Sequence, residues 1–109
     1  MVKKKDLIKE KVRQFYLLIK DIYSVKKVFI YGSYAKGKVS KDSDIDVGVV
    51  VDKLAGSNRI NITASLFHYA AKVDYNIEPR CIFWDEYQKP EKASILSEIL
   101  KSRKDIPLI

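Results

Sequence analysis

Two aspartates, Asp44 and Asp46, stand two residues apart at the start of the apolar run 44–51 (DIDVGVVV). Side chains alternate between the faces of a strand, so both carboxylates would point the same way, with Cβ atoms about 6.5–7 Å apart. Like charges held this close repel one another and favour a bound cation. Mg²⁺ suits such a pair, because it prefers oxygen ligands and is usually completed by substrate phosphates. Taken alone, an Asp-x-Asp more often marks two solvent-facing acids.

The segment before this pair supplies a second feature. Gly32 and Ser33 follow an apolar run, and Lys36, Lys38 and Lys41 stand between them and the acids. Glycine lets the backbone approach a ligand closely, and free N–H groups at the start of a helical turn form an anion site. A phosphate-binding turn beside a metal-binding pair is what a nucleoside triphosphate requires.

A third acidic group is expected from a neighbouring strand, and two candidates are open. Glu78 lies inside a predicted strand, between Ile77 and Pro79, which is unusual for a purely structural acid. Asp74 precedes that strand and is more simply a turn residue. We prefer Glu78. We place Arg80 on the opposite side of the strand from Glu78, and therefore outside the site.

These residues resemble a known signature. The segment 32–50 (GSYAKGKVSKDSDIDVGVV) is similar to the motif of the polymerase beta-like nucleotidyltransferase superfamily, and its first six residues resemble the minimal nucleotidyltransferase branch. The resemblance implies that ATP is bound by Gly32, Ser33, Lys36 and Ser43. It implies Mg²⁺ ligands and catalytic carboxylates at Asp44, Asp46 and Glu78, where the third position is usually Asp in the family. The implied reaction is in-line attack of a hydroxyl on the α-phosphorus of ATP, which releases pyrophosphate.

The family also implies a partner. Larger relatives carry an extra domain that binds the acceptor, and this chain of 109 residues leaves no room for one. Minimal nucleotidyltransferases commonly act as antitoxins of a helical HEPN-domain RNase, and some transfer AMP to that toxin. The alternative is an inactive member of the family that neutralises its partner by occlusion alone. The sequence leaves open whether the chain forms a homo-oligomer.

Length, composition and net charge limit the class of protein to which these residues belong. The length predicts one domain over residues 1–109, and 47% hydrophobic residues are enough for a packed core. A single cysteine excludes an internal disulfide, and no apolar run is long enough to span a membrane, so we expect a cytoplasmic protein. The net charge of +7 attracts phosphates or an acidic partner. Direct nucleic-acid binding is disfavoured, because no strip of aromatic and basic residues is present.

The chain alternates helical and strand patterns, which predicts an α/β protein with a small mixed sheet and helices packed against it. A helical period at Ile8, Val12, Phe15, Ile19 and Ile22 predicts the first helix. In chain order we expect a helix over 6–23, strands over 25–31 and 44–51 with a helical turn over 33–37 between them, a helix over 57–73, a strand over 75–84 and a helix over 90–102 with Ile95 inward. Pro79 makes the third strand an edge strand or bends it. The tail 106–109 docks on the core or adds an extended segment.

Overall fold

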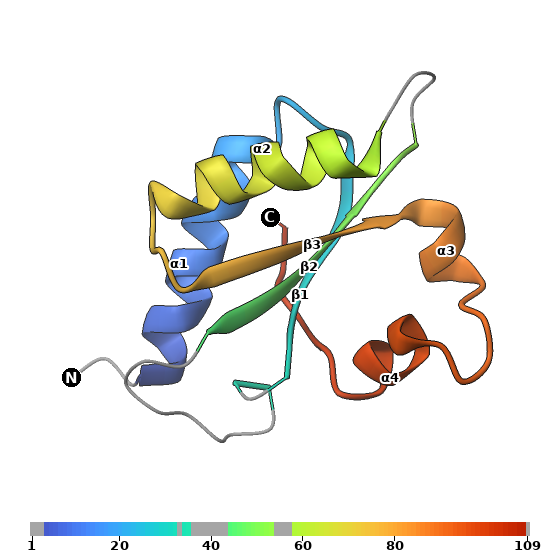
Figure 1. Cartoon of the computed structure of the whole chain (residues 1–109). Coiled ribbons are helices and arrows are strands. Elements are labelled where there is room, and N and C mark those ends of the chain that lie inside the picture. Colours follow the sequence, from blue (N-terminus) through green and yellow to red (C-terminus); the bar gives the residue numbers. More distant parts are fainter. Residues whose placement is uncertain (1–3, 33, 36–43, 54–57, 109) are drawn as a thin grey trace.

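The computed structural model describes residues 4–32, 34–35, 44–53 and 58–108 (Figure 1). The elements in chain order are α1 (Lys4–Ile19), β1 (Val25–Tyr31), β2 (Ile45–Val51), α2 (Arg59–Ala71), β3 (Ile77–Phe83), α3 (Trp84–Gln88), α4 (Ile95–Lys101) and β4 (Lys104–Asp105). The predicted strand over 25–31 is confirmed to the residue. The predicted turn over 33–37 falls largely outside the described residues.

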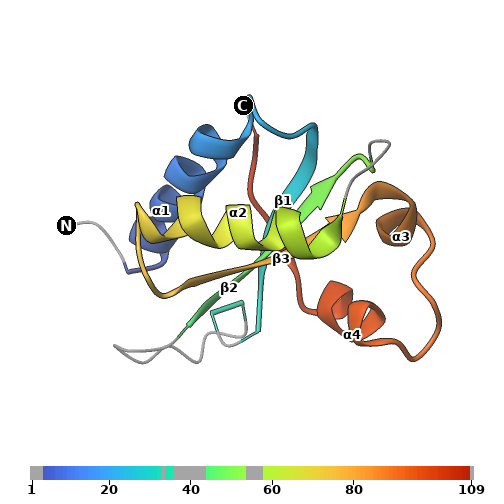
Figure 2. The same cartoon turned by 45° about the horizontal axis from the view of Figure 1, so that its top comes forward.

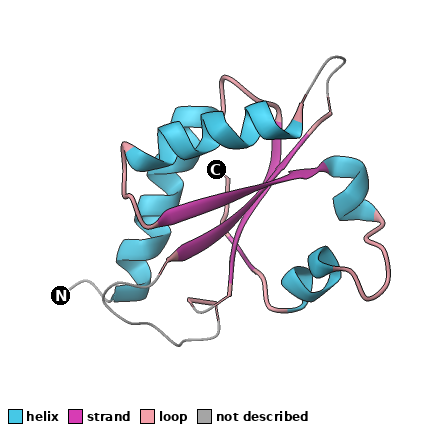
Figure 3. Cartoon of the chain, in the orientation of Figure 1, coloured by secondary structure: helices cyan, strands magenta, loops and turns pink. Residues whose placement is uncertain are grey.

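The strands form one mixed sheet in the order β3-β2-β1-β4. β1 pairs antiparallel with β2 and with β4, whereas β2 and β3 run parallel. The parallel pair is joined through α2, as a parallel connection requires (Figure 3). The predicted mixed α/β architecture is therefore confirmed, and β3 is an edge strand, which accommodates Pro79.

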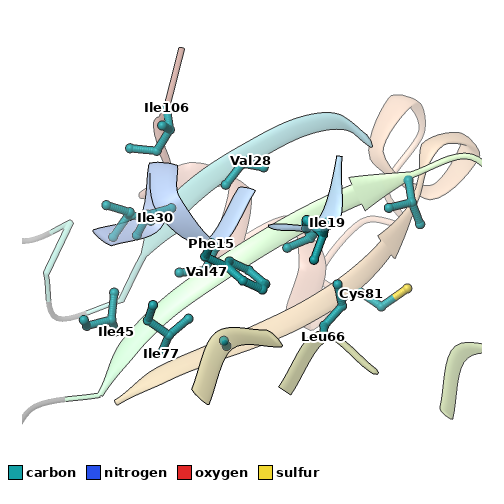
Figure 4. Packing of buried hydrophobic residues seen from close by; sticks show 14 of the residues in the cluster. Phe15, Ile19, Val28, Ile30, Ile45, Val47, Leu66, Ile77, Cys81 and Ile106 are labelled. Atoms are coloured by element: carbon teal, nitrogen blue, oxygen red, sulfur yellow. The ribbon is translucent and has the colours of Figure 1, made fainter. Parts of the chain in front are cut away.

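Helices cover both faces of the sheet. α1 and α2 lie on one face and α3 and α4 on the other (Figures 1 and 2). Figure 4 shows the larger core beneath α1 and α2, where Phe15, Val47 and Leu66 are fully buried. The period-two alternation of β2 sends Val47 to this core and Val50 to a second cluster. That second cluster packs α3 and α4 against the opposite face through Phe29, Val50, Ile82 and Ile99.

The first two helices are shorter than predicted. α1 ends at Ile19, where the carbonyl accepts the N–H groups of Ile22 and Tyr23 in a closing turn. Ile22 was expected inside but is 46% exposed, because it lies beyond the helix. α2 begins at Arg59, since Oδ1 of Asn58 accepts two backbone N–H groups of the first turn.

The C-terminal third departs most from expectation. β3 spans only Ile77–Phe83 of the predicted strand 75–84, and the helix α3, which was not predicted, begins directly at Trp84. The carboxylate of Glu86 accepts the N–H of Phe83 at 3.0 Å, which fixes the start of that helix. The last helix spans only Ile95–Lys101, and Ile95, predicted to face inward, is 70% exposed.

The predicted tail docks on the core through Ile106, and a short strand that was not predicted, β4, lies directly before it. β4 pairs with β1, and the N–H of Ile106 donates to the carbonyl of Val28 at 2.9 Å. Ile106 is buried in the larger core. In the described part of the chain, no helix is long and apolar enough to cross a membrane.

Candidate active site

A row of three side chains crosses the sheet at one end of its strands. Asp46 on β2 is the register partner of Tyr31 on β1 and of Glu78 on β3. Directly opposed residues in neighbouring strands present their side chains on the same face. The sheet therefore brings Asp46 and Glu78 side by side, with Asp44 just before β2.

Gly32 lies next to this row, directly after Tyr31 at the end of β1. The residue has a φ of +72°, a conformation that residues with side chains rarely adopt. A Cβ atom built there would collide with Oδ2 of Asp46. The sheet thus needs glycine at this position for two reasons, and the backbone bend after β1 lies directly against a carboxylate.

The carboxyl groups influence one another's charge. Partial burial raises the pKa of Asp46, the charge of Asp44 raises it further, and the charge of Arg80 opposes both. Burial also raises the pKa of Glu78, and so do the charges of Asp44 and Asp46 and a hydrogen bond with Asp44. Without a cation, this end of the sheet therefore favours protonation.

Asp74, the other candidate for the third carboxylate, is engaged elsewhere. Its Oδ2 forms an ion pair with Nζ of Lys11 at 2.7 Å, and its Oδ1 accepts the N–H of Asn76 at 2.8 Å. The hydrogen bond from Lys11 holds the pKa of Asp74 below its usual value, with the Asn76 bond adding to the effect. Asp74 ties α1 to the turn before β3, and the structure brings Glu78, rather than Asp74, to Asp46.

Arg80 was wrongly placed away from the site. Residues two apart share a strand face, and both Glu78 and Arg80 are exposed while the residues between and beside them are buried. Arg80 lies close enough to Tyr31 to lower the pKa of its phenol in part, and close enough to Asp46 to oppose the rise in the pKa of that carboxyl. The period of two, correctly applied to β3, would have found this residue from the sequence.

Tyr31 was also missing from the predicted site. Burial raises the pKa of its phenol, and the hydrogen bond and charge of Arg80 lower it in part. The remaining predicted phosphate-binding residues, Ser33, Lys36 and Ser43, lie outside the described residues, as do Lys38 and Lys41.

The carboxylates fit a metal ion that is completed by its substrate. Within the described ranges, no three acidic, histidine or cysteine side chains form a ready-made metal site. Asp46 and Glu78 nevertheless supply adjacent hard oxygen ligands whose mutual repulsion a divalent cation would relieve. Mg²⁺ typically takes one or two carboxylates and fills its other positions with waters and phosphate oxygens. Asp44, Asp46 and Glu78 are thus the residues that would hold it.

A pocket of about 330 Å³ adjoins the carboxylates at the outer edge of β3. Its lining includes Glu78 and Arg80 from the strand and Arg59, Thr63 and Phe67 from α2. The site therefore combines acidic oxygens at the strand ends with two guanidinium groups and an aromatic ring beside them.

The family follows from comparison with known proteins. The model of the family described as "Nucleotidyltransferase domain" matches residues 6–106. The chain belongs to the nucleotidyltransferase family. The curated relatives described next support a minimal member of that family.

Two relatives come from Methanocaldococcus jannaschii. "Putative protein adenylyltransferase MJ0141" is 28% identical over 95 residues, which are 86% of this chain and 89% of that protein. "Putative protein adenylyltransferase MJ1379" is 44% identical over 46 residues, which are 42% of this chain and 46% of that protein. The second match thus spans about half of that relative.

Solved structures share the nucleotidyltransferase fold. A "putative nucleotidyltransferase from Sulfolobus solfataricus" superposes with a TM-score of 0.68 at 15% identity, over 93% of this chain and 80% of that one. A toxin–antitoxin with AMP-PNP gives a TM-score of 0.57 at 18% identity, over 91% and 72%. A mutant of the toxin–antitoxin MntA-HpeT gives 0.51 at 17% identity, also over 91% and 72%. At these identities the likeness concerns the fold alone.

Proposed function

We propose that this nucleotidyltransferase uses Mg²⁺ and ATP to transfer AMP to a hydroxyl group of a protein partner. The observation that carries the proposal is the juxtaposition of Gly32, Asp46 and Glu78 across three strands. This row would supply a bend that accepts an anion and, beside it, a carboxylate pair that could bind a metal ion. The relatives named as protein adenylyltransferases support a protein as acceptor.

Each residue of the row has a distinct task in this proposal. Gly32 leaves room for the triphosphate to approach the backbone beside Asp46. Asp44 and Asp46 would hold Mg²⁺, which would neutralise charge on the phosphates. Glu78 lies nearest the open edge of the sheet and accepts the proton of the acceptor hydroxyl. Catalysis is then mostly positioning and charge neutralisation.

The partner we propose is a HEPN-domain toxin, for which this chain would be the antitoxin. Two of the structural neighbours are toxin–antitoxin proteins, one of them with AMP-PNP. Modification of the toxin would then use ATP as the AMP donor, and the chain would recognise its acceptor through a protein interface.

Labelling separates catalysis from occlusion. The protein, Mg²⁺ and α-labelled ATP are incubated with the product of the neighbouring gene, with Asp44→Asn as the matched variant. Label on the partner that is lost with Asp44→Asn supports transfer. Equal toxin neutralisation by both proteins, with no label, would show that the chain acts by occlusion and would refute the proposed reaction.

A further inference from the structure

The strand order gives the two flanks of Asp46 different roles. Gly32 ends β1 on one flank, and Glu78 lies on β3 on the other. In an in-line phosphoryl displacement, the attacking and leaving oxygens lie on opposite sides of the phosphorus. If the bend at Gly32 binds the leaving pyrophosphate, the acceptor must approach from the β3 side.

The β3 side holds the pocket of about 330 Å³ described above. β3 is an edge strand of the sheet, so within the described residues no further strand covers this side of the site. Glu78 lines the pocket, together with Arg80 beside it and Phe67 on α2. An acceptor in the pocket would therefore contact the one carboxylate that is positioned to take its proton.

Two guanidinium groups set the charge preference of this pocket. Arg59 is held in place by an ion pair with Glu86 and by the ring of Phe83, 4.7 Å from its guanidinium carbon. Arg80 forms no ion pair within the described residues. A guanidinium group binds carboxylates with matched geometry. Arg80 is therefore available to pair with an acidic group of an incoming ligand.

One residue of the pocket lining, Phe67, belongs to an apolar stripe along α2. Phe67 is half-exposed, and Ile60, seven residues earlier on α2, is 77% exposed. Ala64 lies between them and is also exposed, so the three residues form one apolar stripe on the helix. An exposed aromatic and aliphatic stripe beside a charged pocket is typical of protein recognition and offers little to a phosphate backbone.

We propose that this pocket is the acceptor site, and that it takes a protein segment in which the hydroxyl residue is accompanied by an acidic and an apolar side chain. Arg80 is the specificity-determining residue, since it pairs with the acidic group, and Phe67 receives the apolar one. This assignment rests on the proposed function, because it needs an acceptor hydroxyl at Glu78.

The transfer step then balances within the site. The acceptor oxygen forms a bond to the α-phosphorus, and the bond from that phosphorus to the bridging oxygen of the β-phosphate breaks. Pyrophosphate leaves on the Gly32 side, and the hydroxyl proton passes to the carboxylate of Glu78.

Two synthetic peptides test the acceptor site. Each contains one tyrosine and one leucine, and the flanking residues are aspartates in one peptide and lysines in the other. With Mg²⁺ and α-labelled ATP, we expect the acidic peptide to be labelled at least tenfold faster. Arg80→Glu should reverse this preference, and Arg80→Gln should abolish it. Lys20→Glu, an exposed charge reversal in the turn directly after α1, should leave it unchanged.

The other outcomes fail in distinguishable ways. If the protein binds MgATP but labels both peptides equally, or neither, the acceptor site is refuted and the nucleotide site stands. Labelling of the 3′-hydroxyl of an oligoribonucleotide in preference to both peptides would also refute it. Absence of MgATP binding would refute the proposed function itself, and the acceptor site with it.

Discussion

The carboxylate of Asp46 on β2 occupies the space that a Cβ atom would need at Gly32, the residue directly after β1. The contact leaves no room for a side chain, and the φ of +72° at Gly32 would be strained in any other residue. One contact therefore fixes both the start of the proposed phosphate-binding segment and the orientation of a proposed metal ligand.

Gly32→Ala should impair activity more than stability. Because alanine is strained at a positive φ, the substitution should lower the free energy of unfolding by about 1–2 kcal/mol. The displaced Asp46 carboxylate should reduce AMP transfer by about 100-fold, because small misplacements of a reacting group are that costly. Urea unfolding and labelled AMP transfer measure the two effects. Transfer at the wild-type rate in a folded Gly32→Ala protein would contradict the proposed role of the contact.

Asp46→Asn should stabilise the protein in the absence of Mg²⁺. The substitution removes a half-buried charge that is repelled by Asp44. We expect a gain of about 0.5–1 kcal/mol, the scale of a single charge interaction near the surface. MgATP should raise the melting temperature of the wild type but not of this variant, because a ligand stabilises only a protein that binds it.

Asp52→Asn is the matched control at the other end of β2. Its carboxylate accepts a hydrogen bond from Ser24 and pairs with Lys26, so its removal should lower the melting temperature. MgATP should stabilise this control as it does the wild type. A loss of stability in Asp46→Asn, or an equal response of both variants to MgATP, would argue against a strained carboxylate pair.

The sequence was most informative where one physical rule decided the outcome. Seven residues of β1 were predicted to the residue, since a β-branched and aromatic run ending at glycine has few alternatives. The same alternation predicted that Ile45, Val47 and Val49 share one face of β2 and that Asp46 lies on the other, although both faces are buried beyond Asp46. Gly32 was identified as a point of close approach, although only the structure shows that Asp46 is the group it contacts.

The failures arose where tertiary contacts decided the structure. α3 was missed because a helix of five residues is too short to show a helical period in the sequence. Its first turn is stabilised by a hydrogen bond from the N–H of Phe83 to the carboxylate of Glu86, and hydropathy does not predict this bond. Ile95 was expected to face inward because the helix was predicted over 90–102. In the structure Ile95 is the first residue of α4. The partner of Asp74, Lys11, is 63 residues away and could not be found from spacing. Arg80 was an avoidable error, since the strand period already placed it beside Glu78.

The Lys11–Asp74 ion pair should make stability depend on acid pH. The pKa of Asp74 is lowered in the folded protein, chiefly by the hydrogen bond from Lys11. The carboxylate therefore contributes stability above its unfolded pKa of about 3.9, and this contribution is lost as pH falls through the lower folded value. Asp74→Asn should lower stability at pH 7 by about 0.5–1 kcal/mol and flatten the acid limb of the stability curve.

Activity distinguishes Asp74 from Glu78 in the same set of proteins. Asp74→Asn should retain AMP transfer, because its carboxylate ties α1 to the turn before β3. Glu78→Gln should lose transfer by about 100-fold, the scale of one positioned acid–base group. If a fully folded Asp74→Asn protein lost AMP transfer, Asp74 rather than Glu78 would be the third carboxylate of the site.

Gly48 and Phe29 should show coupled stability. The two are register partners, and a Cβ atom built at Gly48 would overlap the ring of Phe29. Gly48→Ala should therefore lower the free energy of unfolding by about 1–3 kcal/mol, the range for an overpacked core. Phe29→Leu removes the obstructing ring, so the double variant should be more stable than the sum of the single changes predicts, by about 0.5 kcal/mol or more. Urea unfolding of the four proteins measures this coupling. Strict additivity would show that the ring moves aside freely, and that α3 and α4 do not hold it over Gly48.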